Sequence, residues 1–312
     1  MGRAGLSVME ASQLTSYQHA LLPDEHALAW YDQHGWWISP PCVPDELLDD
    51  VLYGVERFYQ GDRDWQLMIN LGTDWRPEHG EKALRVNDYL SLQIEEFRSL
   101  VRYPLIGAMA ARLARTTAVR LFHDQLLFKP PGSSVDGGAI GWHTDKSYWQ
   151  TCSSEKMLTA WIPLHDCTAE MGSLAVFDGS HRWAHSDDLS NFAMRQQGPA
   201  DAQVRQRYGS QEPTVLELRR GQVSFHHCRT VHGSKANLSA LPRIACAVHF
   251  QDDENSYRRA KLPDGRLATH INDLLCRRSA AGFPDYADPA ICPQIWPHRG
   301  DSVHFDHASG AT

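Results

Sequence analysis

Three residues in the second half of the chain have the types and spacing of a metal site. His143 and Asp145 lie two positions apart in the run Gly-Trp-His-Thr-Asp, and His232 lies far beyond them in the run Val-His-Gly-Ser. Side chains two apart on a strand share a face, so the His143 imidazole and the Asp145 carboxylate can converge on one ion. Two imidazoles and one carboxylate leave three positions of a metal open, which is typical of non-haem Fe(II) sites that activate O2.

Arg243 could complete such a site. It opens a strand-like run directly after a turn that ends in Leu-Pro, shortly after His232. A 2-oxo acid can occupy two of the open metal positions and O2 the third. A planar guanidinium then binds the distant carboxylate of that acid better than a lysine does. A hairpin between His232 and Arg243 would place the metal ligand and the anion anchor on neighbouring strands.

The elements that would position these residues follow from the hydrophobic pattern. Apolar residues at helical spacing predict an amphipathic helix over 47–59 and a helical stretch over 91–115, which Pro104 should kink or split. Beyond residue 116 the pattern changes to short runs rich in β-branched and aromatic residues, separated by Pro and Gly turns. These predicted strands are 119–129, 157–163, 173–178, 214–218, 222–226 and 243–250. Their succession favours a mostly β fold with flanking helices, an antiparallel barrel or jelly roll.

We expect one domain over residues 1–312. Its parts would be a helical N-terminal support at 25–115, a jelly-roll core at 116–252 and a C-terminal extension at 253–312. Polar, partly helical sequence over 186–207 is typical of an insertion between strands.

Composition limits the classes of function. Lys and Arg number 30 against 38 Asp and Glu, the net charge is −8, and the basic residues are not clustered, which argues against a nucleic-acid-binding protein. No run approaches the roughly 18 apolar residues of a membrane span, and the first residues lack the basic-then-apolar order of a secretion signal. The 7 cysteines include no C-x-x-C pair, which disfavours a disulfide framework and a structural zinc site. We therefore expect a cytoplasmic protein that acts on a small molecule; no pattern indicates its oligomeric state.

Several motifs taken together resemble one known family. Beyond Gly-Trp-His-Thr-Asp these motifs are Ala-Trp-Ile-Pro-Leu at 160–164, Gly-Ser-Leu at 172–174, Gly-Ser-His-Arg at 179–182, and His-Gly-Ser at 232–234 followed by Asn237 and Arg243. In this order, over roughly residues 120–252, they resemble the phytanoyl-CoA dioxygenase family of Fe(II)/2-oxoglutarate-dependent oxygenases. The resemblance implies a double-stranded β-helix, a cupin-like form of jelly roll, flanked by helices.

The resemblance also implies roles for individual residues. It makes His143, Asp145 and His232 the iron ligands, and Arg243 the partner of the C5 carboxylate of 2-oxoglutarate. Further co-substrate contacts implied by position are Ser234, Trp161, Gln125 and Lys129. Fe(II), 2-oxoglutarate and O2 are thus the expected cofactor and co-substrates.

The residues around the metal motif are candidates for substrate contacts. In the family such positions often line the substrate entrance, and here they are Trp142, Lys146, Tyr148 and Trp149. A solvated loop with partly buried aromatic residues explains the same sequence equally well. His226 and His227 are adjacent, so they should point to opposite faces of a strand, and we interpret them as packing or supporting residues rather than ligands.

The expected reaction is oxidation of a small organic molecule, with a specialised metabolite as one such class. Hydroxylation of an unactivated C–H bond, with release of succinate and CO2, is favoured because Asp145 is present; the family's halogenases have Gly or Ala at that position. Two alternatives stay open at this point. One is a non-catalytic jelly roll that binds a small ligand, and the other is a zinc or manganese protein that uses the same three ligands.

Overall fold

The computed structural model describes residues 14–69, 71, 77–132, 138–262 and 264–297. Residues 298–312 of the predicted C-terminal extension lie outside this part. The described strands form two antiparallel sheets, one of seven strands and one of four. No helix in the described part has the length and apolar character needed to cross a membrane.

The larger sheet has the strand order β1-β8-β5-β10-β3-β11, and β2 also pairs with β3. Its strands are β1 (Trp36–Ile38), β2 (Arg85–Asp88), β3 (Val119–Lys129), β5 (Leu158–Pro163), β8 (Ser224–His227), β10 (Arg243–Asp252) and β11 (Gln294–Trp296). The smaller sheet has the order β4-β9-β6-β7. Its strands are β4 (Ile140–His143), β6 (Ala175–Val176), β7 (Thr214–Val215) and β9 (His232–Ser234).

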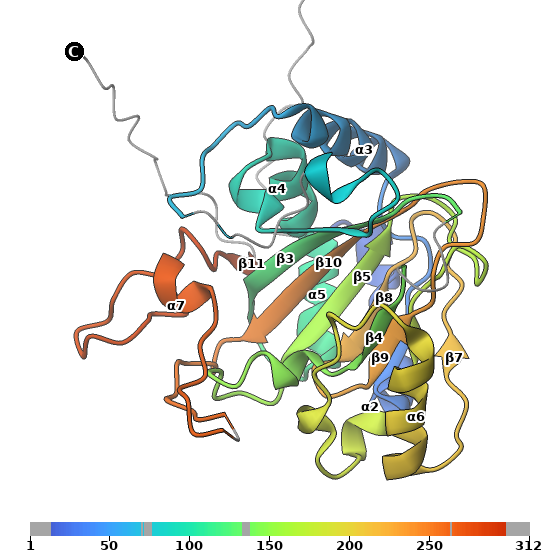
Figure 1. Ribbon diagram of the computed structural model, residues 1–312. Helices are drawn as coiled ribbons and strands as arrows, with labels where there is room; N and C mark the ends of the chain where they lie inside the picture. Colours follow the sequence, from blue (N-terminus) through green and yellow to red (C-terminus); the bar gives the residue numbers. More distant parts are fainter. Residues whose placement is uncertain (1–13, 70, 72–76, 133–137, 263, 298–312) are drawn as a thin grey trace, which may run out of the picture.

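Helices cover the outer face of the larger sheet (Figure 1). The helices of the described residues are α1 (Ser16–Ala20), α2 (Glu25–His34), α3 (Asp45–Gln60), α4 (Glu95–Val101), α5 (Pro104–Leu113), α6 (Gln197–Tyr208) and α7 (Asn272–Leu275). Of these, α6 lies against β4 of the smaller sheet instead. Helix α5 lies against β3, β5 and β10, and α3 packs on α4 at one end of the sheet. The predicted helix over 47–59 is α3. The predicted split at Pro104 separates α4 from α5, because proline begins α5 at a position where its missing N–H is not needed.

Strand β10 shows how the two faces of the larger sheet differ. Ile244, Cys246 and Val248 belong to the apolar core shared with the helices. The intervening Ala245 and Ala247 belong to a second core, between the two sheets. Because side chains alternate along a strand, the odd-numbered residues of β10 face the space between the sheets.

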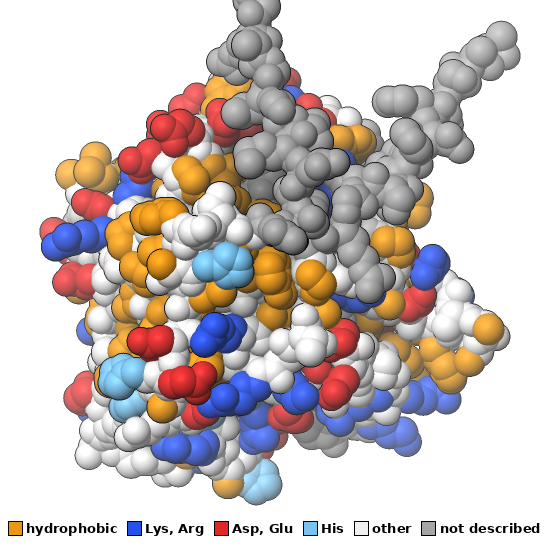
Figure 2. Space-filling model, turned by 180° about the vertical axis from the view of Figure 1, so that it is seen from behind, with side chains coloured by type: hydrophobic (Ala, Val, Ile, Leu, Met, Phe, Trp, Pro, Cys, Tyr) orange, Lys and Arg blue, Asp and Glu red, His pale blue; other side chains and the backbone are white. Residues whose placement is uncertain are grey.

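The two facing antiparallel sheets confirm the predicted jelly-roll class. Strand β3 has the predicted bounds, whereas β6 and β7 are only two residues long. The predicted hairpin between His232 and Arg243 is wrong, because β9 belongs to the smaller sheet and β10 to the larger one. The chain crosses from one sheet to the other between these residues. On the face shown in Figure 2, Lys and Arg side chains lie interspersed with Asp and Glu.

Candidate metal centre

His143, Asp145 and His232 meet between the two sheets. His143 ends β4 and lies opposite His232 of β9 in the antiparallel register. Asp145 is not on the strand, as the sequence pattern suggested, but begins the 3-10 turn η3 (Asp145–Ser147) that follows β4. The turn brings its carboxylate to the same place, and one ligand atom from each of the three residues lies within 4.8 Å of the others. All three side chains are buried.

The two imidazoles present their Nε2 atoms to this centre. His143 Nδ1 lies 2.8 Å from the carbonyl oxygen of Gly141, and His232 Nδ1 lies 2.9 Å from that of Thr230. A carbonyl oxygen only accepts hydrogen bonds, so each Nδ1 carries the proton and each Nε2 keeps its lone pair. This fixed tautomer and ring orientation is what a metal-binding histidine requires.

The protonation states suit metal binding as well. Burial lowers the pKa of His143 and holds the pKa of His232 well below its usual value, so both imidazoles are neutral near pH 7. Burial alone would raise the pKa of the Asp145 carboxyl, but the imidazoles around it outweigh this effect and keep that pKa well below its usual value. The centre therefore offers two neutral nitrogens and one anionic oxygen.

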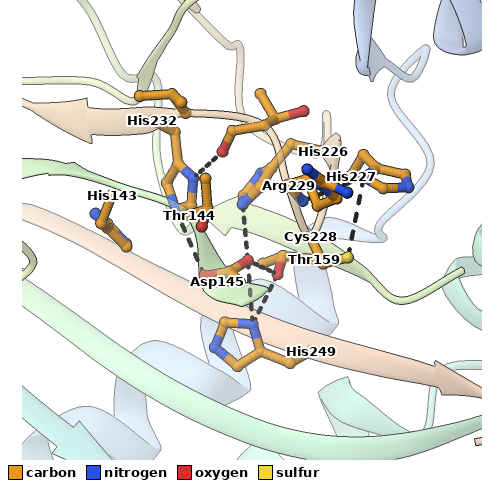
Figure 3. Close-up of polar contacts among 12 residues, drawn as sticks. His143, Thr144, Asp145, Thr159, His226, His227, Cys228, Arg229, His232 and His249 are labelled. Carbon is orange, nitrogen blue, oxygen red and sulfur yellow. Dashed lines mark hydrogen bonds and ion pairs between the residues drawn. The ribbon is translucent and has the colours of Figure 1, made fainter. Parts of the chain in front are cut away.

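Three further residues surround the Asp145 carboxylate (Figure 3). Thr159 Oγ1 donates a 2.6 Å hydrogen bond to Asp145 Oδ2, and His226 Nε2 lies 3.4 Å from the same oxygen. His249 Nδ1 lies 2.7 Å from Thr159 Oγ1. Sequence reasoning missed Thr159 and His249, because neither belongs to a recognisable motif. The alternation of side chains along the predicted strand could have pointed to His249, because it lies on the same face of β10 as Arg243.

His226 and His227 lie on opposite faces of β8. His226 approaches Asp145, whereas His227 Nδ1 accepts a 3.1 Å hydrogen bond from the backbone N–H of Arg229. His226 therefore supports the carboxylate, and His227 belongs to the packing outside the centre.

A buried cavity joins the centre to Arg243. Its lining includes the three metal-site residues, Thr159, His226 and His249, and also Arg243, Trp161, Ser234 and Gln125. The Arg243 side chain is 1% exposed, and its Nε has no hydrogen-bond partner among the described residues. Nη1 makes a long 3.4 Å bond to the Leu127 carbonyl, and the guanidinium lies 5.7 Å from the centre of the Trp161 ring.

Lys129 is a second buried basic residue beside Arg243, although it is not among the residues that line the cavity. It lies opposite Arg243 in the pairing of β3 with β10, and it donates to Ser234 Oγ at 2.7 Å and to the Lys235 carbonyl. Burial and the nearby Arg243 hold the pKa of Lys129 well below its usual value. Within the described residues, no carboxylate forms an ion pair with Arg243 or Lys129. A buried guanidinium without a counter-ion is costly, so this end of the cavity fits an anion.

The four residues predicted for the substrate entrance are placed differently from one another. Tyr148 is 40% exposed, its ring lies 6.1 Å from that of His143, and its hydroxyl accepts a hydrogen bond from the Phe192 N–H. The Trp149 ring is buried beside His249.

Trp142 and Lys146 are not among the residues that line the metal-site cavity. The Trp142 indole donates a 2.6 Å hydrogen bond to Asp201 of α6, on the outer side of the smaller sheet. Lys146 is buried and donates to the carbonyls of Cys152 and Ser154. Trp142 thus holds helix α6, and Lys146 holds the segment that contains Cys152 and Ser154.

The family of this chain follows from its similarity to known protein families. Residues 31–245 match the model of the family described as phytanoyl-CoA dioxygenase. The chain belongs to the phytanoyl-CoA dioxygenase family. The resemblance found in the sequence motifs is thereby confirmed, and the chain is a non-haem dioxygenase that uses Fe(II), 2-oxoglutarate and O2.

Individual relatives agree with this assignment. The ectoine dioxygenase of Bordetella bronchiseptica is 27% identical over 260 residues, covering 77% of this chain and 79% of the relative. A probable alpha-ketoglutarate-dependent hypophosphite dioxygenase of Stutzerimonas stutzeri is 30% identical over 231 residues, which cover 64% of this chain and 73% of the relative. Among solved structures, the non-haem alpha-ketoglutarate-dependent carbocyclase SnoK from nogalamycin biosynthesis has a TM-score of 0.65 at 24% identity, over 87% of this chain and 96% of that one. The similarity to SnoK is a similarity of fold.

Proposed function

We propose that this dioxygenase hydroxylates an unactivated C–H bond of a small organic molecule, with His143, Asp145 and His232 as the iron ligands. The observation that carries the proposal is the buried cavity that joins these three residues to the guanidinium of Arg243, which has no acidic partner among the described residues. A metal ion alone does not need a buried cation nearby. A diacid that chelates the metal through one end needs one, because its other carboxylate is then buried in the protein and requires a counter-charge.

Different residues around the cavity would bind different parts of 2-oxoglutarate. Arg243 would hold the C5 carboxylate of 2-oxoglutarate, with Lys129 acting through the Ser234 hydroxyl and Trp161 forming the wall beside the guanidinium. When bound, iron and 2-oxoglutarate supply the activation of O2, which oxidises the substrate as 2-oxoglutarate becomes succinate and CO2. The buried lining excludes water from this reaction.

Hydroxylation is the simplest outcome for this ligand set. Asp145 occupies a metal position that a halide would need, so an oxygen atom rather than a halogen should reach the substrate. The position of the substrate relative to the metal sets which C–H bond reacts. We also propose that the predicted N-terminal, core and C-terminal regions act as one domain, since α5 packs on the core sheet and β11 pairs with β3.

Aerobic turnover of 2-oxoglutarate tests this function. With Fe(II) present, the wild-type chain should form succinate, and His143→Ala and Asp145→Ala should reduce the rate at least 100-fold because each removes a ligand. His26→Ala, at an exposed position, is the matched control and should keep the wild-type rate. Unchanged succinate formation in the ligand variants would refute the ligand assignment.

The two alternatives make different predictions in the same assay. A ligand-binding jelly roll would bind 2-oxoglutarate without forming succinate. A zinc or manganese enzyme would remain active under anaerobic conditions with that metal bound. The proposed function requires Fe(II) and O2 together, so activity that persists without O2 would exclude it.

A further inference from the structure

The end of the cavity opposite Arg243 carries two hydrogen-bonding side chains that are not among the three metal ligands. They are Gln125 of β3 and His249 of β10, and both line the cavity. Arg243 and His249 lie on the same face of β10, roughly 20 Å apart at 3.4 Å per residue, with only Ala245 and Ala247 between them. The small alanine side chains leave the space along this strand open.

Thr159 determines where the proton of His249 lies. Its single hydroxyl hydrogen must point to Asp145 Oδ2, because two oxygens 2.6 Å apart repel each other without a hydrogen between them. Thr159 Oγ1 can then only accept from His249 Nδ1, at 2.7 Å. His249 Nδ1 therefore carries the ring proton, and the Nε2 atom of the neutral imidazole is a hydrogen-bond acceptor.

Asp88 determines the orientation of the Gln125 amide. Gln125 Nε2 donates a 2.7 Å hydrogen bond to Asp88 Oδ1, a buried carboxylate that can only accept. Reversing the amide would set two oxygens against each other at that distance. The Gln125 oxygen, Oε1, therefore faces His249 Nε2 at 3.5 Å, and two acceptors meet without a hydrogen between them.

Two buried acceptors that face each other need a donor. We propose that the substrate supplies it: a hydroxyl or ammonium group that donates to His249 Nε2 and Gln125 Oε1 and so sets which C–H bond lies over the metal. This inference rests on the proposed function, and it assigns Gln125 to the substrate rather than to 2-oxoglutarate. The Asp88 carboxylate, which accepts the hydrogen bond from Gln125 Nε2, polarises the amide and increases the partial negative charge on Gln125 Oε1. This further favours a hydrogen-bond donor at that oxygen.

Three matched probes test the donor requirement: cyclohexanol, cyclohexylammonium and methoxycyclohexane, the last of which has no donor. Their binding to the chain loaded with Fe(II) and 2-oxoglutarate would be measured under anaerobic conditions by ligand-observed NMR. At least one of the two donor probes should bind about tenfold more tightly than the ether, the effect of one satisfied hydrogen bond. A preference for the alcohol alone or for the ammonium alone identifies which donor the substrate carries.

Two conservative variants separate this role from support of the metal. His249→Asn keeps a donor near the Nδ1 position, toward Thr159, but removes the acceptor at Nε2, so it should lose the donor preference. His249→Gln keeps an acceptor near the Nε2 position and should retain the preference, while Gln125→Leu should lose it. The 2-oxoglutarate dissociation constant should stay within twofold of wild type in all three variants.

The outcomes distinguish failure of this inference from failure of the proposed function. Equal binding of the ether and the donors, no binding of either donor, or a donor preference that survives both His249→Asn and Gln125→Leu would overturn the inference alone. Loss of iron-dependent 2-oxoglutarate binding in the wild-type chain would instead overturn the proposed function.

Discussion

At the scale of single residues, the metal centre depends on side chains that bind no metal. The backbone carbonyls of Gly141 and Thr230 fix the two imidazoles, and Thr159 fixes one oxygen of Asp145. The H-x-D motif and the distal His232 could be predicted from the sequence because residue type and spacing are enough to propose a ligand set. Thr159 could not, since its role depends on a register between strands far apart in the chain.

Thr159→Val tests the support given to Asp145. Valine matches the shape of threonine but cannot donate to Asp145 Oδ2, so the carboxylate loses a 2.6 Å hydrogen bond. We expect Fe(II) affinity to fall about 10-fold or more, the usual effect of removing a partner of a metal ligand. Anaerobic metal titration measures this loss, and circular dichroism checks that the variant is folded. Wild-type affinity in the folded variant would contradict the role of Thr159.

His227 makes a prediction about stability and pH. Burial lowers the pKa of its imidazole from 6.5 to about 3. Between these values the unfolded chain binds a proton that the folded chain does not, so stability is fully present above pH 6.5 and falls as the pH drops toward 3. One such group contributes a slope of at most about 1.4 kcal/mol per pH unit.

Urea unfolding between pH 6.5 and 4 measures that slope. His227→Asn keeps an acceptor for the Arg229 N–H but has no titrating group, so its unfolding free energy should fall less steeply with acid than that of the wild type. The exposed His26→Asn serves as the control and should keep the wild-type slope. Identical slopes for His227→Asn and wild type would show that His227 does not titrate differently on unfolding.

At the scale of elements, the site is built where two sheets face each other. Strands β4 and β9 of the smaller sheet carry His143 and His232, and β10 of the larger sheet carries Arg243. Strands β3, β5, β6, β7, β8 and β10 lie in or overlap runs that the sequence predicted as strands, whereas the short strands β1, β2, β4, β9 and β11 were not predicted. The sheet that each strand joins was not predictable, because pairing partners are distant in sequence, and this is why the predicted hairpin between His232 and Arg243 was wrong.

Gly233→Ala tests the close approach of β4 and β9. A Cβ at Gly233 would lie 2.7 Å from the Ile140 carbonyl oxygen and 2.9 Å from the Trp142 ring, so the strands would have to separate. We expect a loss of about 1–3 kcal/mol in the free energy of unfolding and weaker Fe(II) binding. Gly198→Ala, at a helical glycine with open space around it, should lower neither quantity, since alanine favours the helix more than glycine does. Wild-type stability and metal affinity in Gly233→Ala would show that this contact does not hold the centre.

At the scale of the whole molecule, the helical layer supports the larger sheet, and the reactive site lies between the two sheets. Helices such as α5 cover the outer face of the larger sheet, and this leaves the inner face for the cavity. The amphipathic pattern of α3 and the proline that begins α5 made α3, α4 and α5 predictable. The cavity was not, because its polar lining comes from alternate positions on strands that meet only in the fold.

The central claim is that both sheets hold one iron and one diacid together. An anaerobic crystal structure with Fe(II) and 2-oxoglutarate, using anomalous scattering at the iron edge, measures it most directly. We predict a single iron peak bonded to His143 Nε2, His232 Nε2 and a carboxylate oxygen of Asp145, with the C5 carboxylate of 2-oxoglutarate on the Arg243 guanidinium. Iron bound by a different set of residues, or a C5 carboxylate away from Arg243, would contradict the account.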